Sequence, residues 1–236
     1  MKRDILIAVA ILLFITKSAG GSPAELHDSY KSPFPDDSIR NSLILYNGRI
    51  WQDLFYMIEG DQFLFTKEFM PGTLTMNGKT FRNIRLKVDI FNDEVLIPVP
   101  GGGILQVNKE MVDSFSFVFQ NKNYRFVKAV QEKSAESSGY LNVLFSGKTA
   151  LCIKYFKKTE PPGGEGELDR FYQGMKIIVV KDAIFIQVKN RKDLLMVLND
   201  HREELNSYIK KNHIAVSAQD PESFIPVIRY YEQISN

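Results

Sequence analysis

The sequence predicts an α+β fold in which antiparallel β meanders and curved sheets are followed by C-terminal helices. Two observations lead to this prediction. Between residues 42 and 188, short runs with apolar residues at every second position are separated by Gly, Pro, Asn or Asp. From residue 190 onward, the apolar residues recur with the period of a helix. Strands that precede the helices, rather than alternating with them, are typical of α+β chains.

The first twenty residues have the pattern of a secretory signal peptide. Lys2 and Arg3 precede eleven apolar residues at positions 5–15, and Ser18 and Gly20 are small residues before a predicted cleavage site. A helix of that apolar length reaches only about 16 Å, against roughly 30 Å of bilayer hydrocarbon. We therefore expect cleavage near Gly20 and a mature chain that is periplasmic or secreted.

The residues after the leader bear on how the mature chain is held in its compartment. The residue that follows the leader is Gly21 rather than a cysteine, so no lipid anchor is expected, and no later stretch has the length of a transmembrane span. Residues 21–41 are rich in Pro, Ser and Asp, which predicts an extended lead-in.

The charge of the chain argues against nucleic acid as a partner. The formal net charge is +2, and the leader alone contributes this excess through Lys2, Arg3 and Lys17 against Asp4. A mature chain of zero net charge has no electrostatic preference for nucleic acid or for anionic lipid.

Residues 42–130 are expected to form an antiparallel β region. Asn77-Gly78 predicts a two-residue hairpin turn, because these residue types accept the positive φ angles of a type I′ turn. Residues 85–91 alternate apolar and charged side chains, which predicts a strand with one dry face, and Asn92-Asp93 turns it. Pro98 and Pro100 end the returning strand, because proline cannot donate to the ladder.

Later in this region, residues 114–119 place Phe115, Phe117 and Phe119 on one face of a strand. The polar stretch 131–139 that follows predicts a boundary or a flexible hairpin tip.

Residues 139–236 are expected to contain β hairpins and then helices, either as a second unit or as one continuous domain with residues 42–130. Strands at 140–145 and 150–156 are joined at Ser146-Gly147, and a last hairpin is expected at 176–188. Asn190 and Asp220 are predicted helix N-caps. Cys152, the only cysteine, alternates with apolar residues and is expected to be a buried strand residue rather than a reactive thiol.

Two Gly-Lys-Thr triplets, at 78–80 and 147–149, raise the question of a phosphate-binding loop. That motif needs a glycine five positions before the second one, where this chain has Thr73 and Asn142. Both triplets are also predicted at hairpin turns, whereas a phosphate loop leads from a strand into a helix. The run 101–103 likewise lacks the later glycine of a dinucleotide site, so no nucleotide cofactor is predicted.

No catalytic or metal-binding set is predicted. The three histidines, His27, His201 and His213, are scattered, and neither His-Glu-x-x-His nor Gly-x-Ser-x-Gly occurs. Two weaker readings involve carboxylates. Glu165, Glu167 and Asp169 could offer oxygens to calcium, although a solvated acidic loop is favoured, and Asp89 with Asp93 or Glu94 could form a glycosidase pair.

An aromatic-rich stretch is the main candidate for a binding site. Aromatic residues make up 12% of the chain, and they crowd the segment that begins at position 51. They could form a core between a curved sheet and its cover, or a partly exposed face for an apolar ligand, a sugar or a partner. The candidate ligand-binding residues are Trp51, Phe55, Tyr56, Phe63 and Phe65, with an apolar pocket expected near Trp51, Phe55 and Phe63.

Three stretches carry a resemblance to a known group of proteins. Residues 77–93, 139–151 and 228–234 resemble segments of exported, β-rich bacterial proteins that bear signal peptides and have no established activity. The resemblance implies an exported protein built of sheet and helix, and it transfers no catalytic residue.

The sequence therefore predicts an exported, non-enzymatic envelope protein with a binding or assembly role. Its partner would be an apolar ligand, a glycan or an envelope protein. The alternative prediction is a secreted or periplasmic hydrolase whose site forms only in the folded chain.

Overall fold

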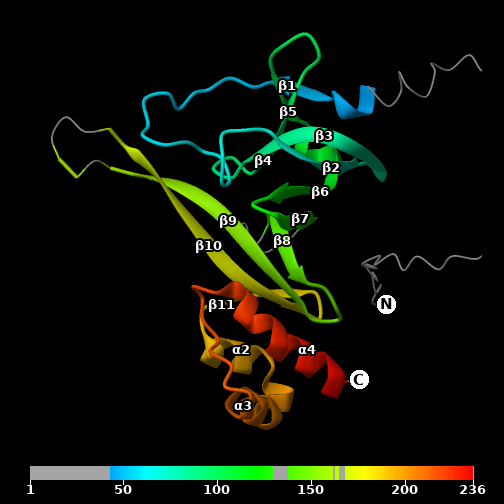
Figure 1. Ribbon diagram of the computed structural model, residues 1–236, viewed down its shortest axis with the longest axis vertical. Helices are drawn as coiled ribbons and strands as arrows, with labels where there is room; N and C mark the ends of the chain where they lie inside the picture. Colours follow the sequence, from blue (N-terminus) through cyan, green and yellow to red (C-terminus); the bar gives the residue numbers. More distant parts are fainter. Residues whose placement is uncertain (1–42, 130–137, 162, 165–167, 236) are drawn as a thin grey trace, which may run out of the picture. The chain divides into compact units, whose positions relative to one another are not determined.

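The computed structural model describes residues 43–129, 138–161, 163–164 and 168–235, all within one compact unit (Figure 1). The predicted leader (1–20) and lead-in (21–41) lie outside the described residues, as does most of the predicted boundary at 131–139.

The described residues form one antiparallel sheet of eleven strands (Figure 1). The strands are β1 (Gly48–Ile50), β2 (Met70–Met76), β3 (Lys79–Asp89), β4 (Glu94–Pro98), β5 (Ile104–Val107), β6 (Val112–Phe119), β7 (Lys122–Ala129), β8 (Gly139–Phe145), β9 (Ala150–Glu160), β10 (Arg170–Lys181) and β11 (Ile184–Val188). Their order is β1-β5-β4-β3-β2-β6-β7-β8-β9-β10-β11. The prediction of a mostly antiparallel sheet followed by C-terminal helices is confirmed, and the label α+β fits it approximately.

Tight two-residue turns join three of the hairpins. Met76 pairs with Lys79 across Asn77-Gly78, whose φ angles are 47° and 76°, as a type I′ turn requires. The β6–β7 and β10–β11 hairpins use turns of the same kind, with positive φ at both central residues, although neither turn contains glycine.

Two pairings join strands that are distant in the sequence. β1 pairs with β5, and β2 pairs with β6, so the meander β2-β3-β4-β5 lies beside the meander β6 to β11. The β3–β4 turn also reaches across to β9, because the carbonyl of Ile90 accepts a hydrogen bond from the amide of Lys157 at 3.3 Å. The sheet is therefore curved enough for two strands at distant places in its order to touch.

The main core lies within this curve. Phe115 and Phe117 are buried and stack against Phe126, while Phe119 packs at the edge of the same cluster, as the strand pattern predicted. Cys152 is buried, and its burial raises the pKa of the thiol to about 12, which fits the predicted structural role.

The helices form a second core with the last strands. They are α2 (Arg191–Val197), α3 (Arg202–Lys211) and α4 (Ile225–Ile234), with short 3₁₀ turns at Lys109–Met111, Asn199–His201 and Pro221–Phe224. Asn190 and Asp220 cap as predicted, accepting from the amides of Asp193 and Glu222. Buried residues of β9, β10 and β11, including Leu151, Val179 and Val188, pack with the apolar faces of these helices.

β9 and β10 continue beyond their neighbours as a two-stranded arm (Figure 1). β8 pairs with β9 only as far as Ile153, and β11 pairs with β10 only as far as Ile177. Residues 154–160 and 170–176, called the arm below, pair with each other and with no other of the eleven strands.

Candidate functional site

The five aromatic residues singled out in the sequence do not form one surface. Trp51 lies beside Phe63, with ring centroids 5.9 Å apart, whereas Phe55 and Phe65 join two other aromatic clusters. Tyr56 is 79% exposed. The five are close in sequence, but the chain between residues 50 and 70 crosses several strands, so their side chains meet different parts of the sheet.

Trp51 and Phe63 belong to a cage around a lysine that the sequence did not single out. The ammonium of Lys87 on β3 lies 3.9 Å from the ring centroid of Phe63, 4.9 Å from that of Phe69 and 5.1 Å from that of Trp51. Lys87 is only 6% exposed, and burial lowers its pKa. The sequence predicted that Lys87 lies on an alternating strand. It could not predict that the three rings surround Lys87, because their positions depend on the fold.

Phe55 anchors the same segment to the arm. Its ring lies 5.0 Å from Phe91 and 5.8 Å from Phe171, and the three rings meet edge to face. Edge-to-face pairs of this kind add about 0.5–1.5 kcal/mol each beyond the area they bury. Phe65, by contrast, is partly buried and packs at the edge of the main core with Phe119, Tyr124 and Tyr155.

Backbone hydrogen bonds hold this segment at both ends. The amide of Trp51 donates to the carbonyl of Ile104, the first residue of β5, at 2.8 Å. At the other end, the amide of Glu59 donates to Asp169 at 2.7 Å, and the amide of Phe171 donates to Glu59 at 3.0 Å. Residues 50–60 are called the anchored loop below, because these bonds and the rings of Trp51 and Phe55 fix its course.

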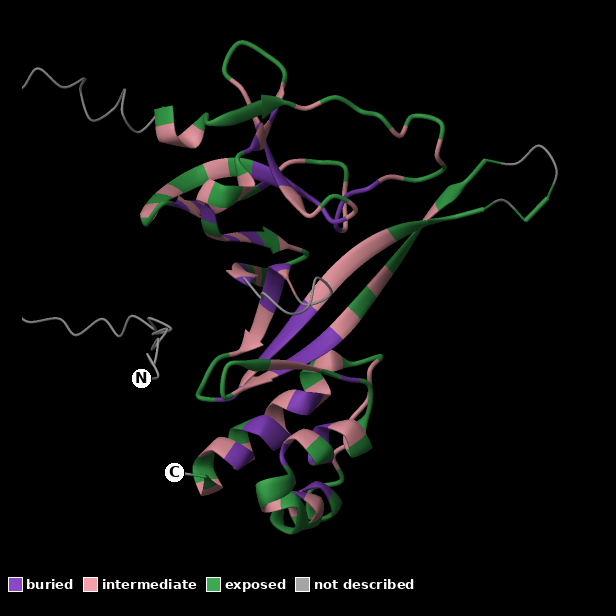
Figure 2. Ribbon diagram, turned by 180° about the vertical axis from the view of Figure 1, so that it is seen from behind, coloured by how far each residue is buried: buried purple, intermediate pink, exposed green. Residues whose placement is uncertain are grey.

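Between its anchors, most of the loop is exposed (Figure 2), and its exposed residues include large apolar ones. Leu54 is 73% exposed and Met57 is 60% exposed, and Tyr56 and Ile50 are exposed as well. Single exposed apolar residues are common on protein surfaces, but this loop carries four within eight positions, and these four residues are called the exposed apolar patch below.

A hollow of about 260 Å³ adjoins this patch. Its apolar wall includes Trp51, Leu54 and Phe55, and its polar wall includes Glu94 and Gln106. Burial raises the pKa of Glu94. The pocket expected near Trp51, Phe55 and Phe63 thus corresponds to an open hollow with a mixed lining, and Phe63 does not line it.

The second Gly-Lys-Thr triplet binds a carboxylate of the protein itself. The triplet forms the β8–β9 turn, where the amides of Lys148 and Thr149 donate to the carboxylate of Glu232 on α4 at 3.1 and 2.6 Å. The first triplet spans the β2–β3 turn and the start of β3. Neither triplet leads into a helix, and both lie at the hairpin turns that the sequence predicted.

The carboxylates of the β3–β4 turn hold the turn in place. Asp89 is fully buried and accepts from the amides of Phe91 and Asn92, and burial raises its pKa. Asp93 accepts from Lys154 at 2.6 Å and from Lys109 at 2.8 Å. These contacts give Asp89 and Asp93 structural roles, so the weaker glycosidase reading gains no support from them.

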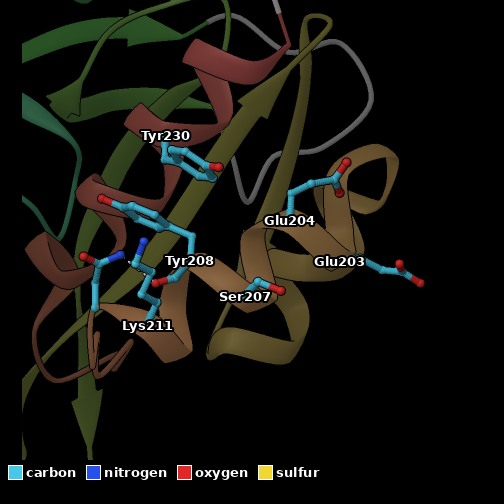
Figure 3. A pocket seen from close by; sticks show the side chains of 7 residues that line it. Glu203, Glu204, Ser207, Tyr208, Lys211 and Tyr230 are labelled. Atoms are coloured by element: carbon cyan, nitrogen blue, oxygen red, sulfur yellow. Dashed lines mark hydrogen bonds between the residues drawn. The ribbon is translucent and has the colours of Figure 1, made fainter.

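Another hollow lies on the helices, and none of the five candidate ligand-binding residues lines it (Figure 3). It measures about 760 Å³, and its most regular feature is a pair of stacked rings, Tyr208 from α3 and Tyr230 from α4, with centroids 4.1 Å apart. The other residues that line it are Glu203, Glu204, Ser207, Lys211 and Asn212. The two rings cover each other, and mainly polar side chains of α3 surround them.

Among the residues that the structure describes, no three His, Cys, Asp or Glu side chains are grouped closely enough to hold a metal ion. Of the residues considered as ligands, His27, Glu165 and Glu167 lie outside the described part. Within that part, no helix is both long and apolar enough to cross a membrane.

A comparison with protein families, curated proteins and solved structures finds no match to this chain. The resemblance to exported bacterial β-rich proteins therefore stays a prediction.

Proposed function

We propose that this is an exported, non-enzymatic binding or assembly protein, and that it recognises a protein partner through the anchored loop. The observation that carries the proposal is a contrast within residues 50–60. Trp51 and Phe55 fix the loop to the sheet and the arm, while Leu54, Tyr56 and Met57 between and beyond them are left in water.

This contrast is expected of a recognition surface. Burying one large apolar side chain contributes about 1.5–3 kcal/mol, so leaving several exposed forgoes a substantial stabilisation unless a partner covers them. A loop that is already fixed loses little conformational entropy on binding, which favours affinity. Binding residues are commonly found on loops that a rigid scaffold positions.

A protein fits this surface better than a small apolar ligand or a glycan. A small-molecule site encloses most of its ligand in a concave pocket, whereas the hollow beside Trp51 is open and the exposed side chains project outward. Tyrosine and methionine are enriched where proteins bind one another. Carboxylates of the β3–β4 turn are engaged in structural contacts, so the hydrolase alternative has no comparable support.

The experiment that tests this proposal is the selection of binders from a random peptide display library on the mature chain. We expect the selected peptides to lose at least about tenfold in affinity for the variants Tyr56→Ser and Met57→Ser, a size typical of central interface residues. Met196→Ser on α2 is the matched control, because Met196 is 59% exposed and Met57 is 60% exposed. Selected peptides that bind both loop variants and wild type equally would overturn the proposal.

A further inference from the structure

We propose that the partner segment is cationic as well as apolar, namely an amphipathic stretch in which Lys or Arg alternates with large apolar residues. This inference rests on the proposed function of the anchored loop, and it adds the chemistry of the partner. Two independent features of the surface support it: the distribution of charge around the exposed apolar patch, and the lining of the adjoining hollow.

The first feature is a local excess of carboxylates. Residues 50–61 contain Asp53, Glu59 and Asp61 and no Lys or Arg, although the chain as a whole has slightly more basic than acidic residues. The loop lies beside the start of β10, where Asp169 and, across the arm, Glu160 add two more acidic residues.

Cations balance only some of these carboxylates: the buried Lys87 attracts Asp53 and Asp61 electrostatically. Asp61 is paired with Lys157 at 3.0 Å, and Asp53 accepts from the amide of Phe55. For Glu59, Glu160 and Asp169, the salt bridges within the described residues include no partner at 4 Å or less, and Arg170, which pairs with Glu160 across the arm and bridges Glu59, is the one cation placed among them by the backbone pairing. An apolar patch with an acidic border favours a partner that brings positive charge to the border.

The second feature is the hollow itself. Glu94 contributes a carboxylate to one wall, and Trp51, Leu54 and Phe55 contribute the apolar side. A lysine or arginine side chain has this combination of an apolar stem and a charged end. Arg49 also lines the hollow, and its Nη2 lies 3.5 Å from Glu94 while the side chain stays largely exposed, so a partner's cation would share the carboxylate with Arg49.

The same charges argue against two other occupants. A second copy of the chain, bound through the same loop by twofold symmetry, would bring two acidic borders together. A membrane surface rich in anionic lipid would repel them, because such surfaces attract basic segments. The cationic peptide is the occupant that the surface favours.

The test uses Trp51 as its own reporter, because it is the only tryptophan of the chain and it lines the hollow. Mature protein would be titrated with three synthetic peptides of equal length that lack tryptophan: alternating Leu-Lys, alternating Leu-Glu and alternating Gly-Lys. We expect Leu-Lys to change the fluorescence of Trp51 and to bind at least about tenfold more tightly than either other peptide. Salt should weaken this binding, since the border charges are exposed.

Two charge-reversal variants test whether the Leu-Lys peptide binds at the anchored loop. Glu59→Lys should weaken binding of the Leu-Lys peptide about fivefold or more, whereas Glu203→Lys, an equal change on exposed α3, should leave it unchanged. Equal effects of the two reversals would mean non-specific attraction and would overturn the inference. So would tighter binding of the Leu-Glu peptide, self-association abolished by Met57→Ser, or Trp51-dependent binding to vesicles of anionic or zwitterionic lipid.

Failure of this inference can be told apart from failure of the proposed function. If library peptides are selected that depend on Tyr56 and Met57 but are neutral or acidic, the binding role stands and the cationic partner is wrong. If no selected peptide depends on those two residues, the binding role itself fails.

Discussion

Lys87 experiences two opposing effects on a single ammonium group. Removal from water disfavours its charged form, and this burial lowers its pKa. The rings of Trp51, Phe63 and Phe69 favour the same charged form through cation–π attraction, worth about 0.5–2 kcal/mol for a desolvated contact. Its hydrogen-bond partner is the carbonyl of Lys67 at 3.5 Å, which is too long to compensate for lost water.

The lowered pKa of Lys87 predicts a pH dependence with a definite sign. Between the lowered folded-state pKa and the ordinary value of 10.5, the unfolded chain holds a proton that the folded chain has released. Stability therefore rises with pH in this alkaline window. We expect the free energy of unfolding of wild type to increase relative to Lys87→Met as the pH is raised from 7 towards 10.

Urea denaturation followed by circular dichroism at several pH values measures this difference. Lys192→Met, which removes an exposed lysine from α2, controls for the general loss of one positive charge. A difference in free energy of unfolding between wild type and Lys87→Met that stays constant from pH 7 to 10 would contradict the prediction.

At the scale of the elements, local patterns in the sequence predicted the hairpins well. The Asn77-Gly78 turn and the phenylalanine face of β6 each depend on residues within one hairpin, so the sequence contains the whole signal. The alternation in β3 predicted the strand, but the expected wet face was wrong, because Lys87 and Asp89 on that face are buried under segments that are distant in sequence. The pairings β1–β5 and β2–β6 depend on which distant edges meet, and no local pattern records this.

The candidate site was only partly predictable for the same reason. Clustering in the sequence identified Trp51 and Phe55, but whether each ring is an anchor or is exposed depends on distant partners. Phe171 and Lys87 are such partners, and they lie 116 and 36 positions away from Phe55 and Trp51 respectively. Tyr56 was assigned to the same group, although no distant ring meets it.

The contact between the β8–β9 turn and α4 gives a prediction for two elements. Glu232 satisfies two backbone amides, and a Cβ at Gly147 would lie only 2.6 Å from its carboxylate oxygen, so the approach is close. Glu232→Ala leaves these amides without their acceptor and should lower the free energy of unfolding by about 1–3 kcal/mol. Gln233→Ala, on the exposed side of the same helix, should change it by less than about 0.5 kcal/mol. Denaturant titration of both variants checks this, and equal losses would contradict it.

At the scale of the whole described unit, Asp93 connects parts of the sheet that are far apart in strand order. Its side chain extends from the β3–β4 turn to Lys109 before β6, to the amide of Tyr140 on β8 and to Lys154 on β9. Together with the hydrogen bond between Ile90 and Lys157, these contacts keep the curved sheet closed around the main core. They also fix Phe91 beneath Phe55, so the geometry of the anchored loop depends on the same closure.

Asp93→Asn tests this closure without disturbing the turn. Asp93 has φ 59°, which asparagine accepts, so the substitution mainly removes the charge that partners Lys154. Burial already lowers the pKa of Lys154, and loss of its partner leaves a nearly buried cation uncompensated, a change that costs about 3 kcal/mol or more.

Asp182→Asn is the matched control, because Asp182 also has positive φ, at 51°, but lies exposed in the β10–β11 turn. We expect a lower melting temperature for Asp93→Asn, with a weaker Trp51 response to the Leu-Lys peptide, and a wild-type value for Asp182→Asn. If both variants had the same melting temperature as wild type, the proposed closure of the sheet through Asp93 would be refuted.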